Sequence, residues 1–84
     1  MLIHSPEALA LALIAMRKKR NLSQSTIGEL VGLKQQTISA FENNPNGTKL
    51  ESLFRILSAV GADIEIQEKN KANLVADKRW TEEW

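Results

Sequence analysis

The segment "SQSTIGELVGLKQQTISAFENN", from Ser23 to Asn44, carries the clearest structural pattern of this 84-residue chain. Its apolar residues recur at helical spacing both before and after a central glycine, Gly32. That glycine is placed to end the first helix in the left-handed conformation. The segment therefore predicts two short helices, ending near Val31 and beginning near Gln35, joined by a tight turn. A polar run, "KQQ", opens the second helix.

Two short helices that cross through such a turn form a helix-turn-helix. The close crossing requires a small residue on the first helix, which Gly28 supplies, and Ile38 and Phe41 are predicted to face the core. The opposite, polar face of the second helix is then free to enter a DNA major groove, where Lys can pair with guanine and Gln with adenine. The predicted base-contacting residues are Lys34, Gln35, Gln36 and Ser39, and the predicted phosphate-contacting residues are Ser23, Gln24, Thr37 and Asn43.

Further helices flank this motif. Ser5, Pro6 and Glu7 are typical of a helix start and predict a helix as far as about Lys19. After the turn signal "NNPNG", Thr48 and Glu51 fit a capping box that would open another helix, which Gly61 would end. We expect a mainly α, compact bundle of four to five helices over residues 1–61. We expect this last helix to have a broad apolar face and Phe54 and the leucines on it to be core residues; the face consists of Leu50, Leu53, Phe54, Leu57 and Val60.

The pattern changes after Gly61. Residues 62–68 include "ADIEIQ", which alternates with period two and predicts a strand with Ile64 and Ile66 on one face. A lone strand needs a partner, so we expect it to pair with its counterpart in a homodimer, although the two isoleucines could instead extend the core of one chain. Residues 69–84 are polar and predict a flexible tail. Within that tail, Trp80 and Trp84 either fold back on the body or, as we prefer for Trp84, anchor a partner protein.

Composition narrows the possible functions. The chain has no cysteine and one histidine, His4, so the sequence predicts no metal site, no cofactor and no catalytic centre, and we expect no enzyme. The apolar run from Ala8 to Met16 is too short to cross a bilayer and does not follow a basic segment, so a cytoplasmic protein without a membrane partner is expected. The run "RKKR", Arg17 to Arg20, is interpreted as a solvated helix end, with phosphate contact as the alternative.

The stretch "SQSTIGELVGLKQQTISAFEN" resembles the helix-turn-helix of the phage-repressor-like and Xre-type regulators. The resemblance implies that Gln24 bonds a phosphate and braces Gln35, the first Gln of the recognition helix. The family usually has Ala where this chain has Gly28, a change that keeps the residue small.

A closer resemblance spans nearly the whole chain. The motifs "HSP", "KQQTIS", "FENNP", "LFRIL" and the terminal "EW" are together similar to the HipB antitoxins. That resemblance implies a homodimeric transcriptional autorepressor and antitoxin, with double-stranded operator DNA and a HipA-like toxin kinase as partners. The alternatives are a free-standing phage-type repressor without a toxin, and an interaction protein whose helix-turn-helix no longer binds DNA.

Overall fold

The first helix, α1 (Pro6–Lys19), begins where the sequence places it. This computed structural model describes residues 1–69 of the chain. Ser5 caps α1 by accepting a hydrogen bond from the Ala8 amide to its Oγ at 3.0 Å, and Pro6 occupies the first turn. Arg17, Lys18 and Lys19 lie in the last turn, where the partial negative charge of the helix end favours cations.

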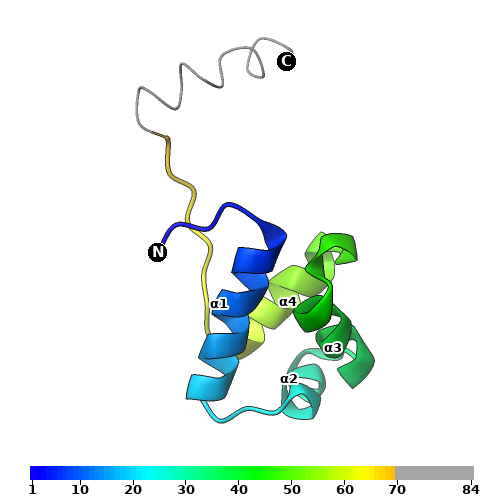
Figure 1. Cartoon of the computed structure of the whole chain (residues 1–84). Coiled ribbons are helices and arrows are strands. Elements are labelled where there is room, and N and C mark those ends of the chain that lie inside the picture. Colours follow the sequence, from blue (N-terminus) through cyan, green and yellow to red (C-terminus); the bar gives the residue numbers. More distant parts are fainter. Residues whose placement is uncertain (70–84) are drawn as a thin grey trace.

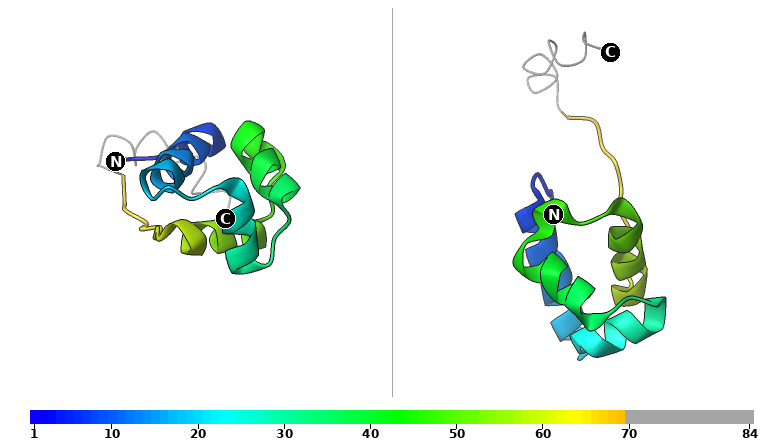
Figure 2. Two further views of the ribbon diagram at one scale, coloured as in Figure 1. Left: turned by 90° about the horizontal axis from the view of Figure 1, so that it is seen from below. Right: turned by 90° about the vertical axis from the view of Figure 1, so that its right-hand side faces the viewer.

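Three further α-helices follow and surround one apolar core, so the expected mainly α bundle is confirmed for the described residues. These are α2 (Gln24–Val31), α3 (Gln35–Asn43) and α4 (Leu50–Val60), with a short 3₁₀ turn, η1 (Pro45–Gly47), before α4. Helix α2 packs against α3 and α4, while α1 packs against α3, η1 and α4 (Figures 1 and 2). The buried side chains of this core are Ala10, Leu13, Ile27, Ile38, Phe41, Ile56, Leu57 and Val60.

The start of α4 differs from the prediction. Helix α4 begins at Leu50 with Lys49 at its N-cap, and no side chain caps it, so the predicted capping box of Thr48 and Glu51 is wrong. The backbone amide of Thr48 instead donates to the Pro45 carbonyl at 3.0 Å and closes the 3₁₀ turn. Because that turn uses Thr48, the helix begins one residue later than predicted, with Lys49 rather than Thr48 as its N-cap. Glu51 pairs instead with Arg55 at 2.8 Å.

The apolar face of α4 is also wider than the core can cover. Leu57 and Val60 are buried as predicted, but Phe54 is 57% exposed and Leu50 is 71% exposed. The expectation that Phe54 belongs to the core of one chain is therefore wrong. Leu53 lies between these extremes and packs against the core.

Residues 62–68 form no strand within the described part of this single chain. They leave α4 as an extended segment, yellow to orange in Figure 1, with Ile64 47% and Ile66 93% exposed. Because both side chains are exposed, the alternative in which the two isoleucines extend the core of one chain is wrong. A strand needs a hydrogen-bonding partner, so pairing with a second copy stays a prediction. The tail proposed from residue 69, with Trp80 and Trp84, lies outside the described residues apart from Lys69. None of the described helices has the length and hydrophobicity needed to span a membrane.

Candidate nucleic-acid interface

The turn between α2 and α3 has the geometry that the sequence predicts. Gly32 caps α2 with φ of 72° and ψ of 32°, the left-handed conformation that glycine adopts without steric cost. The Leu33 amide then donates to the Gly28 carbonyl at 2.9 Å, which folds the chain back across the end of α2. The turn thereby sets the angle at which α3 leaves α2.

Gly28 is needed where the chain crosses itself most closely. A Cβ added at this position would stand 2.4 Å from the carbonyl oxygen of Leu33, well inside van der Waals contact. The prediction that a small residue is required here is confirmed. The close neighbour, however, is the backbone of the turn rather than the body of α3.

Helix α3 presents a polar N-terminus to solvent. Lys34 is the N-cap, and its carbonyl accepts from the Thr37 amide at 2.9 Å. Lys34, Gln35 and Gln36 are all exposed, whereas Ile38 on the opposite side of the helix is buried. The three residues predicted to contact bases therefore form one exposed polar group at the start of α3.

Two more of the predicted residues continue this face along α3. Gln35, Ser39 and Asn43 are four residues apart in turn, a spacing that places them on one side of a helix. The Asn43 amide nitrogen donates to Ser39 Oγ at 3.2 Å, so these two side chains hold each other in place. Gln35 and Asn43 are exposed, whereas Ser39 and Thr37 are half-buried.

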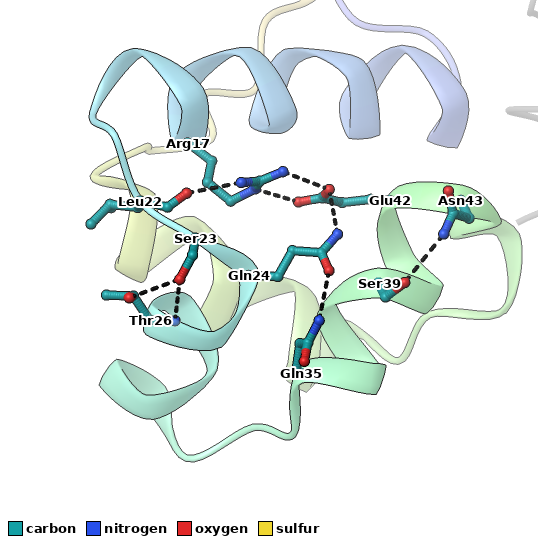
Figure 3. A network of polar contacts seen from close by, with 9 residues as sticks. All are labelled: Arg17, Leu22, Ser23, Gln24, Thr26, Gln35, Ser39, Glu42 and Asn43. Carbon is teal, nitrogen blue, oxygen red and sulfur yellow. Dashed lines mark hydrogen bonds and ion pairs between the residues drawn. The ribbon is translucent and has the colours of Figure 1, made fainter.

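A hydrogen-bonded bridge connects α2 to α3. Gln35 Nε2 donates to Gln24 Oε1 at 3.3 Å, and Gln24 Nε2 in turn donates to Glu42 Oε1 at 2.9 Å (Figure 3). The contact between Gln24 and Gln35 is the one implied by the family resemblance. Gln24 thus uses both ends of its amide to hold the first residue of α3 against the body of the domain.

Glu42 is itself held by Arg17 from α1. Arg17 donates from Nε to Glu42 Oε2 at 2.7 Å and from Nη2 to Glu42 Oε1 at 3.0 Å, and its Nη1 donates to the Leu22 carbonyl at 2.8 Å (Figure 3). Only 13% of the Arg17 side chain and 10% of the Glu42 side chain are exposed. The interpretation of Arg17 as part of a solvated helix end is therefore wrong, although Lys18, Lys19 and Arg20 are exposed.

Sequence reasoning missed the Arg17–Glu42 pair because the two residues stand 25 positions apart on different helices. No periodicity connects them. A weak signal exists, since each falls beside core positions of its own helix, where an unpaired charge would be costly. We call the chain of contacts through Arg17, Glu42, Gln24 and Gln35 the polar relay.

Ser23 has a structural role at the start of α2. Its Oγ accepts from the Thr26 amide at 3.0 Å and lies 2.9 Å from Thr26 Oγ1 (Figure 3). This N-cap leaves the first amides of α2 directed toward the space in front of the helix, where a phosphate oxygen could accept from them. Ser23 and Gln24 are thus adjacent at that helix end.

The chemistry of this surface is that of hydrogen-bond donors and acceptors. Lys34 supplies a cation, the glutamines supply paired donor and acceptor groups, and Ser39 and Asn43 supply smaller polar groups. Within residues 1–69, no group of three or more histidines, aspartates or glutamates is placed to hold a metal ion. The arrangement can recognise another polar surface by its pattern of donors and acceptors.

Comparisons with known proteins agree with this geometry. A family model described as Helix-turn-helix matches residues 13–67, which include α2, α3 and α4. Antitoxin HipB of Escherichia coli O6:H1, strain CFT073, is 35% identical over 82 residues, which cover 98% of this chain and 87% of that protein. The similarity therefore extends over nearly the full length of both chains.

Solved structures show the same fold. A structure described as a HipB-O4 20mer complex has a TM-score of 0.81 and 36% identity, over 83% of this chain and 99% of that chain. A structure of a HipA-HipB-O2-O3 complex has the same TM-score, identity and coverage. At this identity and coverage, the likeness includes sequence as well as fold.

Proposed function

The chain belongs to the Helix-turn-helix family and, within it, to the family of HipB antitoxins, and from this premise we propose that it is a dimeric DNA-binding antitoxin and transcriptional autorepressor. It binds operator DNA in the major groove through α3 and binds a HipA-like toxin kinase. The observation that carries the DNA-binding part is the polar relay, which fixes Gln35 at the exposed start of α3.

The relay leaves Gln35 able to read a base. A glutamine amide has two N–H donors and one carbonyl acceptor, and Gln24 accepts from only one of those donors. The second N–H and the carbonyl oxygen then remain for the N7 and N6 positions of adenine, the bidentate pairing that glutamine makes in the major groove. Lys34, Gln36 and Ser39 contact neighbouring bases on the same face.

Gln24 is equally suited to contact the DNA backbone. One of its N–H groups is used on Glu42 and its carbonyl on Gln35, so one N–H remains for a phosphate oxygen. Because Arg17 neutralises Glu42, that carboxylate does not repel the phosphate. Ser23, Thr37 and Asn43 complete the backbone contacts, which set the register of α3 on the duplex.

The dimer follows from the size of a DNA site. One α3 helix reads few base pairs, and dimeric helix-turn-helix proteins place two such helices about 34 Å apart, one turn of DNA. We propose that residues 62–68 of two copies pair and bury Ile64 and Ile66, which are exposed in the single chain. We propose the cytoplasm as the site of action, because the operator DNA is the ligand.

The toxin partner is proposed from the relatives, among which is the HipA-HipB complex. Trp84 is proposed as the anchor that enters the toxin, because tryptophan buries a large area with few rotatable bonds. The relatives that match nearly the whole chain are antitoxins. This favours an antitoxin over a phage-type repressor without a toxin.

The proposed function is tested by co-expression with the product of the neighbouring reading frame. We expect a HipA-like kinase to co-purify with the full chain, and a gel shift with the upstream operator to weaken steeply as salt is raised. Deleting residues 81–84 should lower the affinity for the toxin and leave operator binding unchanged. Operator binding without any toxin at the locus would support the free-standing repressor instead.

A further inference from the structure

The connection between α3 and α4 contains the dipeptide Asn46–Gly47, inside the 3₁₀ turn η1. Both residues are exposed to solvent. The Asn46 side chain makes no hydrogen bond to any other residue of 1–69. Its amide carbon, Cγ, is therefore not held away from the backbone nitrogen of Gly47. A bond between these two atoms would close a five-membered ring.

Gly47 leaves that ring unobstructed. After most asparagines, the side chain of the following residue shields its own backbone nitrogen, but glycine has no side chain. The neighbouring residues do not shield it either, because a Cβ added at Gly47 would have no atom within 4 Å. The backbone nitrogen of Gly47 is thus open on the side that a larger residue would cover.

The other asparagines within residues 1–69 lack this combination. The side-chain amide of Asn43 donates to Ser39 Oγ at 3.2 Å, which holds it in place. Asn44 precedes a proline, whose nitrogen carries no hydrogen and cannot act as the nucleophile. Asn21 precedes a leucine, whose branched side chain shields the backbone nitrogen. Among these residues, Asn46 has both a free amide and an unshielded neighbour.

The turn has to open before the ring can close. In a 3₁₀ turn the ψ of Asn46 is about −20 to −30°, and the planar ring requires ψ to rotate away from this value. The turn spans three residues and is closed by the bond from the Thr48 amide to the Pro45 carbonyl at 3.0 Å. A short turn at the surface opens at a small cost in free energy. The rate of ring closure therefore depends on how often η1 opens.

We infer that Asn46 is a site of spontaneous deamidation. The Gly47 nitrogen, after losing its proton to hydroxide, forms a bond to Asn46 Cγ. The bond from Cγ to Nδ2 breaks, and that nitrogen leaves as ammonia. Water then opens the cyclic imide at either of its two carbonyls, giving aspartate or isoaspartate. The sum of the steps consumes one water and releases one ammonia, and nothing is oxidised or reduced.

Both products change the charge of the chain, and one also changes its backbone. A carboxylate replaces a neutral amide, so the formal net charge falls from +1 to 0. Aspartate keeps the main chain intact, whereas isoaspartate adds a methylene group to it within η1. Because η1 packs against both α1 and α3, the isoaspartate form should have the lower free energy of unfolding.

The test is to incubate the full chain at neutral and at alkaline pH and to separate its charge forms by ion exchange. We expect a form with one positive charge fewer, and peptide mass mapping should place the change at residue 46. The form should appear faster at the higher pH, because the reacting nitrogen must lose a proton. An isoaspartyl methyltransferase with S-adenosylmethionine as methyl donor should label the isoaspartate fraction.

Gly47→Ala is the matched control. The φ of Gly47 is not positive, and an added Cβ meets no atom, so alanine should fit without disturbing the fold. Its methyl group shields the nitrogen, and conversion at residue 46 should slow severalfold. Asn46→Asp supplies the charge of the product with a normal main chain. In urea unfolding, the methyltransferase-labelled fraction of the incubated chain should be less stable than Asn46→Asp.

The outcomes are independent of the proposed function, since neither DNA nor a toxin takes part in the reaction. Absence of conversion at residue 46 at alkaline pH would overturn the inference. Equal rates at residue 46 in the unaltered chain and in a folded Gly47→Ala variant would overturn it as well, because the open glycine nitrogen would then have no role. Equal stability of the isoaspartate form and Asn46→Asp would contradict the effect on η1.

Discussion

Arg17 on α1 and Glu42 on α3 form an ion pair with two hydrogen bonds, of 2.7 and 3.0 Å, at a site that is almost closed to solvent. The pair joins the first helix of the domain to the recognition helix. Glu42 also accepts from Gln24, so the same carboxylate contributes both to the stability of the fold and to the position of the residues proposed to read DNA. Changes at this pair should therefore affect folding and binding together.

The first prediction concerns the stability that this pair provides. Glu42→Gln keeps the shape of the side chain but removes the charge and directs an N–H group toward the Arg17 donors. Removing one partner of a buried pair leaves the other charge uncompensated, and we expect a loss of about 3 kcal/mol in the free energy of unfolding. Urea unfolding followed by circular dichroism measures this change.

The exposed pair of Glu51 and Arg55 provides the control. Its side chains are 77% and 44% exposed, so solvent screens the interaction. Glu51→Gln should change the free energy of unfolding by less than about 0.5 kcal/mol. Equal losses in the free energy of unfolding for Glu42→Gln and Glu51→Gln would show that the buried Arg17–Glu42 pair stabilises the fold no more than the exposed pair does.

The second prediction concerns base reading by Lys34. Its side chain is exposed at the N-cap of α3 and makes no capping hydrogen bond, so it is available to a guanine edge. Lys34→Ala should cost about 1–3 kcal/mol of operator affinity and relax discrimination at one base position. Titration of a set of operators with single base changes measures this effect. A uniform loss on every sequence would instead identify Lys34 as a phosphate contact.

The third prediction concerns the coupling of Gln24 and Gln35. Gln24→Ala should weaken specific and non-specific DNA binding alike through loss of a phosphate contact, and it should also release Gln35. Gln35→Ala should weaken specific binding only. In a double-mutant cycle on operator affinity, we expect a coupling energy of at least about 0.5 kcal/mol. Additive effects would contradict the coupling through the polar relay. Unchanged non-specific binding in Gln24→Ala would contradict the phosphate contact of Gln24.

The sequence predicted the local features of the fold well, because those features depend on neighbouring residues. Ser5 and Ser23 cap their helices, and Gly32 and Gly61 end theirs in the left-handed conformation. The capping box of Thr48 failed because a 3₁₀ turn competed for the same backbone amide. Local patterns specify which groups are able to cap, and the tertiary path of the chain selects among them.

The predictions that failed for contacts between distant parts of the sequence failed for a different reason. Periodicity identifies Phe54 as apolar but does not show whether its own chain or another copy covers it, and the structure leaves it 57% exposed. The Arg17–Glu42 pair depends on how α1 docks against α3, which no single helix encodes. For the candidate site, the sequence pattern predicted the exposed start of α3 and the family resemblance implied the Gln24–Gln35 contact, but neither indicated the ion pair that supports them.

The last prediction compares the two glycines of the turn. Gly32→Ala meets no atom within 4 Å but forces alanine to a φ of 72°, which should cost about 1–2 kcal/mol. In Gly28→Ala the backbone conformation suits alanine, but the space does not. Alanine favours the helix by about 1 kcal/mol, yet its Cβ would stand 2.4 Å from the Leu33 carbonyl oxygen, which is backbone and cannot rotate away.

For Gly28→Ala the clash should outweigh the helix preference, because the turn must shift and strain the bond from the Leu33 amide to the Gly28 carbonyl. We expect a lower free energy of unfolding and, because the turn sets the position of α3, weaker operator binding as well. Gly32→Ala, which disturbs no neighbour, should lose stability with a smaller effect on the affinity of the folded fraction. Urea unfolding and operator titration of both variants make the comparison. A stability gain of about 1 kcal/mol in Gly28→Ala would mean that the turn moves away from the new Cβ without cost, so that helix propensity alone sets the effect of this substitution.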